Sequence, residues 1–101
     1  MINKSELQYS LDSIVVYILD DIIAPMIKEA PGLLKIDPHH TNLGEFFEEP
    51  LDSQVAIRNI IRKYQLPKFA QEYIDEDFSF AQLAIFILLN GIYNEDYRGV
   101  A

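Results

Sequence analysis

The residues of this sequence most suited to catalysis, by type and by spacing, are carboxylates. They gather in short stretches, "GEFFEEPLD" (44–52), "DED" (75–77) and "IYNEDY" (92–97), each close to aromatic residues and none containing Lys or Arg. Paired carboxylates can perform acid–base catalysis, as in glycoside hydrolysis. Acids clustered on apparent loops, however, are more often surface than active site. The sequence therefore predicts no enzymatic activity and no catalytic residue.

The two histidines, His39 and His40, are adjacent and are the other candidates for chemistry. Adjacent histidines can hold a metal or move a proton, but metal sites use three or four ligands at regular spacing, and no HExxH or similar pattern is present. The acids at 75–77 do not begin a calcium loop, because its sixth and twelfth positions would be Phe80 and Phe86. We interpret "DPHH" as a solvated turn and predict neither a metal nor a cofactor.

Composition and charge limit the partners of this 101-residue chain. Its length suits one α-helical domain over residues 1–101, half of its residues are apolar, and it has no cysteine for a disulfide or a thiolate metal site. The formal net charge of −8 opposes binding to nucleic acid or to a membrane surface and favours a basic protein partner. No signal peptide is visible, and the most apolar stretch, 80–89, is too short to span a bilayer. We therefore expect a cytoplasmic protein.

Hydrophobic periodicity predicts the helices that would position these stretches. An apolar stripe with three-and-four spacing runs through residues 7–27, which places its members on one side of a helix. Pro25 lies inside the pattern and lacks a backbone donor, so a kink or break is expected near Ala24. "APG" at 30–32 should end this helix. The stripe consists of Leu7, Leu11, Ile14, Val15, Ile18, Leu19, Ile22, Ile23, Met26 and Ile27.

Further helices complete the expected fold. One should begin near Asp52 or Ser53, and a short one should follow with Pro67 as its first residue. The last, residues 80–89 after a Ser79 cap, is apolar on nearly all sides and should be the buried centre. The predicted class is all-α, a compact bundle of four to five helices around a central apolar helix. The two middle helices should bury Val55, Ala56, Ile57, Ile60, Ile61, Tyr64, Phe69, Ala70, Tyr73 and Ile74.

The charges of the chain are unevenly distributed. Residues 36–57 hold five acids and no Lys or Arg, and residues 69–97 hold six more, again without a base. Aromatic anchors flanked by charges that steer a partner are typical of protein interfaces. The simpler alternatives are that Phe46 and Phe47 hold a loop on the core and that the acids confer solubility alone. The predicted partner-binding residues are Glu45, Phe46, Phe47, Glu48, Glu49, Asp52, Asp75, Glu76, Asp77, Tyr93, Glu95, Asp96 and Tyr97.

As a small, acidic, cysteine-free and helical chain without catalytic motifs, the sequence resembles bacterial immunity proteins. These include the immunity proteins of contact-dependent growth inhibition systems and of the colicin nucleases. Proteins of that class bind a cognate toxin and cover its active site or substrate surface. The resemblance is carried by "GEFFEEPLD" and "IYNEDY", which are similar to the acid-and-aromatic surfaces of such inhibitors. It implies a toxin inhibitor, with a nuclease as the expected target.

Two other functions stay open. A small acidic chaperone or adaptor for a secreted effector would bind an extended client segment and would more often dimerise through an apolar helix face. A subunit of a larger assembly would have its excess apolar surface covered by neighbours. A toxin gene next to the one encoding this chain would favour immunity over both, and the sequence leaves the oligomeric state open.

Overall fold

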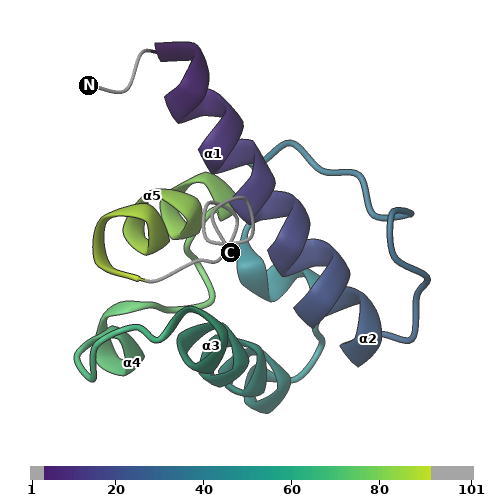
Figure 1. Ribbon diagram of the computed structural model, residues 1–101. Helices are drawn as coiled ribbons and strands as arrows, with labels where there is room; N and C mark the ends of the chain where they lie inside the picture. Colours follow the sequence, from purple (N-terminus) through teal and green to yellow (C-terminus); the bar gives the residue numbers. More distant parts are fainter. Residues whose placement is uncertain (1–3, 92–101) are drawn as a thin grey trace.

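Helices make up the regular structure of this chain, which a computed structural model describes over residues 4–91 (Figure 1). No strand occurs in that range, where the bridge between Asn42 and Ser79 is the sole isolated β-type pairing. The predicted all-α class is confirmed. The elements in chain order are α1 (Lys4–Ile18), the π-helical turn η1 (Leu19–Ile23), α2 (Ala24–Met26), the 3-10 turn η2 (Leu43–Phe46), α3 (Pro50–Tyr64), α4 (Ala70–Tyr73) and α5 (Phe80–Asn90).

The first three elements form one helical rod, and the hydrogen-bond spacing changes inside it. The N–H of Ala24 donates to the carbonyl of Leu19, five residues back. The helix therefore widens just before Pro25, which has no N–H to donate. The expected break near Ala24 is absent, because the chain stays helical through this residue, and the irregularity takes the form of a π turn. The rod ends earlier than predicted, because Lys28 already takes a left-handed backbone conformation (φ 61°) ahead of "APG" at 30–32.

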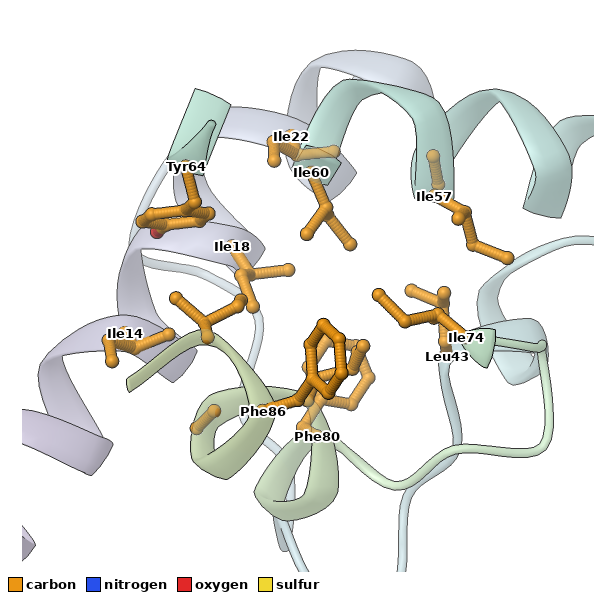
Figure 2. Packing of buried hydrophobic residues seen from close by; sticks show 14 of the residues in the cluster. Ile14, Ile18, Ile22, Leu43, Ile57, Ile60, Tyr64, Ile74, Phe80 and Phe86 are labelled. Carbon is orange, nitrogen blue, oxygen red and sulfur yellow. The ribbon is translucent and has the colours of Figure 1, made fainter. Parts of the chain in front are cut away.

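The core forms where the rod, α3 and α5 meet. α5 packs along α1, and α3 contacts the rod at η1 (Figure 1). Figure 2 shows fully buried side chains from all three elements turned toward one interior, among them Ile14, Ile18, Ile60 and Phe80. Burying one such side chain contributes roughly 1.5–3 kcal/mol. The three-and-four stripe predicted from the sequence supplies the side of the rod that faces the core, except for Leu7, which is 40 % exposed.

Tyr64, at the end of α3, places a hydroxyl group in this core (Figure 2). Its side chain is 2 % exposed, and its hydroxyl has no hydrogen-bond partner in the described part of the chain. Burial, followed by the negative charge of Asp21, raises the pKa of this phenol well above its ordinary value of 10.0. The folded protein therefore holds Tyr64 as a neutral phenol.

The prediction of a fully buried central helix is wrong for part of α5. Leu83 and Ile87 are fully buried, but Ile85 is 48 % exposed and Leu89 is 76 % exposed. α1 covers one side of α5. α4 has only four residues and is too short to cover the other side. An apolar strip of α5 is left at the surface for this reason.

Some side chains that were expected inside also lie at the surface. α4 presents Phe69 and Tyr73 outward while Ala70 and Ile74 are buried, so half of its predicted inward set is wrong. Val55, on α3, is also exposed. On a one-turn helix, residues three or four apart share a side, so burying Ala70 and Ile74 turns the two aromatic residues toward solvent.

Two helix starts also differ from expectation. α3 begins at Pro50 rather than near Asp52, because proline at the first helical position has no hydrogen bond to lose. α4 begins at Ala70 rather than at Pro67. The N–H of Ala70 donates to the carbonyl of Pro67 at 3.0 Å, so the preceding residues form a turn that leads into the helix.

Candidate protein-binding surface

Two acidic stretches that are far apart in the sequence lie side by side in the fold. The N–H of Leu43 donates to the carbonyl of Phe78, and that of Gly44 donates to the carbonyl of Glu76, both at 2.9 Å. These bonds join η2 to the turn that precedes α5. Together the two stretches form what we call the acidic face, made of Glu45, Glu48, Glu49, Asp52, Asp75, Glu76 and Asp77.

A glycine makes this approach possible. A Cβ atom added at Gly44 would lie 2.9 Å from the Cβ of Glu76 and 3.2 Å from its carbonyl oxygen. Contacts this short with a neighbouring backbone are not tolerated without movement. Gly44 therefore fixes how closely the two acidic stretches meet.

Three carboxylates of the acidic face also hold local structure. Glu45 Oε2 accepts from the N–H of Asn42 at 2.7 Å, and Asp75 Oδ1 accepts from the N–H of Asp77 at 2.8 Å. Asp52 lies in the first turn of α3, where the helix dipole favours a negative charge. The other four carboxylates have no hydrogen bond or ion pair within residues 4–91 and are available to a partner; they are Glu48, Glu49, Glu76 and Asp77.

Two of the three basic residues of α3 lie at the other end of that helix. Arg62 and Lys63 are in its last turn, about 15 Å along the axis from Asp52. Lys63 Nζ pairs with Asp21 Oδ2 at 3.1 Å, on the rod. Surface charges are screened beyond roughly 8–10 Å at physiological salt, so Arg62 and Lys63 do not compensate the acidic face. Arg58 is nearer, roughly 9 Å along the axis from Asp52, but it forms no ion pair with these acids within residues 4–91.

The two phenylalanines of "GEFFEEPLD" pack on the protein's own core. Both are half-buried, and the ring of Phe46 meets that of Phe80 edge to face, with centroids 5.8 Å apart. Of the two interpretations that the sequence left open, this packing favours an anchor for the loop over an anchor for a partner. The exposed apolar side chain of this stretch is Leu51, at 73 %, which sequence reasoning missed.

A second feature adjoins the acidic face on the side of α4 and α5. Exposed aromatic and aliphatic side chains line an open groove of about 440 Å³. Their rings contact one another, with Tyr73 stacked on Phe86 at 5.1 Å and edge-on to Phe78 at 5.4 Å. Residues 75–77 lie between Tyr73 and Phe78 in the chain, so these three acids lie close to the groove without lining it. We call this the aromatic groove and define it by Phe69, Tyr73, Phe78, Ile85, Phe86 and Leu89.

No protein-family model, curated protein or solved structure matches this chain. The acidic face is the candidate site for a charged partner, and the aromatic groove is the apolar surface next to it.

The histidines lie in a turn, as the sequence predicted. His40 Nδ1 is 2.7 Å from Asp37 Oδ2, and the N–H of His39 donates to the other carboxylate oxygen of Asp37. Both histidines are exposed. The hydrogen bond from His40, then that from His39, lowers the pKa of the Asp37 carboxyl. Residues 4–91 contain no group of three or more His, Cys, Asp or Glu side chains placed to hold a metal.

The remaining predicted site residues lie outside the described part of the chain. They belong to the stretch "IYNEDY" and are Tyr93, Glu95, Asp96 and Tyr97. Within residues 4–91, no helix is both long enough and apolar enough to cross a bilayer.

Proposed function

We propose that this protein is an inhibitor of the immunity-protein kind, which binds a toxin with a basic surface, in particular a nuclease, through the acidic face. One observation carries the proposal: backbone hydrogen bonds hold two distant acidic stretches of the chain side by side, and no Lys or Arg within residues 4–91 forms an ion pair with their carboxylates. Gly44 permits the close approach of the two stretches.

The substrate that a nuclease holds is negatively charged. An enzyme that acts on nucleic acid presents a positive cleft to the phosphates. A protein with clustered, unpaired carboxylates competes for that cleft directly. Opposite charge also steers the encounter and raises the association rate by about 10- to 1,000-fold. An inhibitor benefits from such speed because it must capture the toxin before the toxin acts.

The experiment uses a variant that removes charge and leaves local hydrogen bonds intact. Glu45, Asp52 and Asp75 are kept because of their structural roles. The acidic-face variant carries Glu48→Gln, Glu49→Gln, Glu76→Gln and Asp77→Asn. It raises the formal net charge from −8 to −4.

A matched control changes the net charge equally at other places. The acids changed in the control lie on or just after the rod formed by α1, η1 and α2. The control variant carries Glu6→Gln, Asp12→Asn, Asp21→Asn and Glu29→Gln. In the wild type, Asp12 accepts a hydrogen bond from Gln8, and Asp21 accepts one from Lys63. The side-chain amide oxygens of the substituted residues can still accept these two bonds.

Each protein is coexpressed with the toxin candidate encoded next to it, and growth of the cells is measured. We expect wild type and the control variant to protect and the acidic-face variant to fail, with all three folded by circular dichroism. Equal protection by the two variants would show that the acidic face is not the inhibitory surface. Failure of wild type would contradict inhibition of that toxin.

The open apolar lining of the aromatic groove favours a second candidate function, an adaptor or chaperone that holds an extended segment of a secreted effector. The two functions differ in what happens to the bound protein. An inhibitor abolishes the partner's activity at one-to-one stoichiometry, whereas an adaptor leaves the activity of the folded client intact. An activity assay of the purified complex separates them.

A further inference from the structure

We infer that the aromatic groove receives an apolar side chain of the partner, flanked in the partner by Lys or Arg that pair with residues 75–77. This inference rests on the proposed function for the basic character of the partner, and it adds which feature of the partner is recognised. The occupant is a protein segment with a bulky aromatic or aliphatic anchor between basic residues.

The walls of the groove are preformed. The Tyr73 ring stacks on Phe86 with an interplanar angle of 24°, and it meets Phe78 at 87°. Phe69 meets the same Phe86 ring edge-on at 5.8 Å. Phe86 is itself part of the core, so it fixes the position of the rings that pack against it. A partner therefore loses little affinity to reorganisation of this surface.

The exposed apolar area makes the groove a place where an anchor gains affinity. Leu89 is 76 % exposed, Tyr73 56 %, Phe69 52 % and Ile85 48 %. Four large apolar side chains gathered at one surface, rather than scattered singly, mark an interaction site. Aromatic side chains at such a centre, with charges at the rim, match the usual anatomy of an interface.

The negative charge near the groove favours a basic partner over two other possible occupants. A second copy of this chain would bring another net charge of −8 to a surface that is already acidic. The chain's own residues 92–101 carry Glu95 and Asp96 against a single base, Arg98, so their charge also opposes residues 75–77. A basic partner gains from the same acids next to the groove that repel both alternatives.

The experiment is a titration of the isotopically labelled full-length chain, followed by NMR chemical shifts. The probe is the capped peptide Lys-Lys-Phe-Leu-Lys-Lys. One comparison peptide replaces Phe-Leu with Ala-Ala at the same charge, and another replaces the four lysines with glutamates. We expect the anchored basic peptide to shift resonances of Tyr73, Phe78 and Leu89, and to bind about tenfold more tightly than the Ala-Ala peptide.

A pair of variants localises the anchor. Leu89→Ser removes an exposed leucine of the groove, and Leu51→Ser removes an equally exposed leucine outside it. Neither side chain is in the core, so both proteins should fold. We expect Leu89→Ser to lose most of the advantage of the anchored peptide and Leu51→Ser to keep it.

The outcomes separate this inference from the proposed function. If both basic peptides bind equally and shift residues 75–77 alone, the groove does not receive an anchor, although the acidic face still binds a basic partner. If neither basic peptide binds, the acidic face itself fails. Groove resonances that move with protein concentration, or contacts between the groove and residues 92–101, would show that a second copy or the chain's own end is the occupant.

Discussion

At the scale of single residues, Tyr64 makes the clearest prediction about stability. Its buried hydroxyl has no partner within residues 4–91, and an unsatisfied buried polar group costs about 1–3 kcal/mol. Phenylalanine has the same shape without that group. We expect Tyr64→Phe to raise the free energy of unfolding by about 1 kcal/mol in urea denaturation. A loss of stability would show that the hydroxyl is satisfied in solution.

Tyr64 should also make stability depend on pH in alkali. The folded state raises its pKa above 10.0, so the unfolded chain loses this proton first as the pH rises. The contribution of Tyr64 is therefore fully present below about pH 10 and declines as the pH climbs toward the raised pKa. Wild type should lose more stability between about pH 8 and about pH 11 than Tyr64→Phe does. Parallel losses in the two proteins would contradict the assignment.

Gly44 tests how the acidic face is assembled. Its substitution by Ala places a Cβ against Glu76, and overpacking of this kind costs about 1–3 kcal/mol. We expect Gly44→Ala to be less stable and to lose hydrogen-exchange protection at residues 43 and 44, whose amides donate to the second stretch. Glu45→Gln, which keeps its capping acceptor, is the control and should retain that protection.

At the scale of elements, α5 contains a matched pair of leucines. Leu83 is fully buried and Leu89 is 76 % exposed on the same helix. Leu83→Ala should cost about 2–5 kcal/mol, because it leaves a cavity. Leu89→Ala should change stability by less than about 0.5 kcal/mol. Equal effects in thermal unfolding would mean that the exposed strip of α5 is covered.

The same helix shows where sequence reasoning succeeds and where it stops. The Ser79 cap and the run to Asn90 were predictable, because capping and apolar patterning are local properties. Which sides of α5 are covered was not predictable, because an all-round apolar helix does not encode the position of its neighbours. The short α4, whose buried side excludes Phe69 and Tyr73, decides that question.

The acidic face was predictable in its residues but not in its geometry. The sequence identified the clusters around Glu48 and Glu76 by their lack of nearby bases. Their meeting depends on long-range backbone hydrogen bonds between irregular segments, which have no periodicity to read. Gly44 was a visible signal, since an isolated glycine in an irregular segment often marks a close backbone approach. The sequence left open whether Phe46 anchors the loop or a partner, and its contact with Phe80 favours the loop.

At the scale of the whole molecule, clustered negative charge should cost stability. With a net charge of −8, like charges on one surface repel one another in the folded state. We expect the acidic-face variant to melt roughly 2–4 °C higher than wild type at low salt. The difference should shrink at high salt, because screening removes the repulsion. A variant that melts lower at every salt concentration would show that these carboxylates stabilise the fold.

The most direct test of the central claim is the salt dependence of association with the toxin candidate, measured by stopped-flow mixing. Wild type should associate fast at low salt and slow steeply as salt rises. The acidic-face variant should associate at least about tenfold more slowly at low salt and depend little on salt, while the control variant stays close to wild type. If the two variants, which carry the same net charge, lose the same factor in rate, then overall charge and not the acidic face accounts for binding.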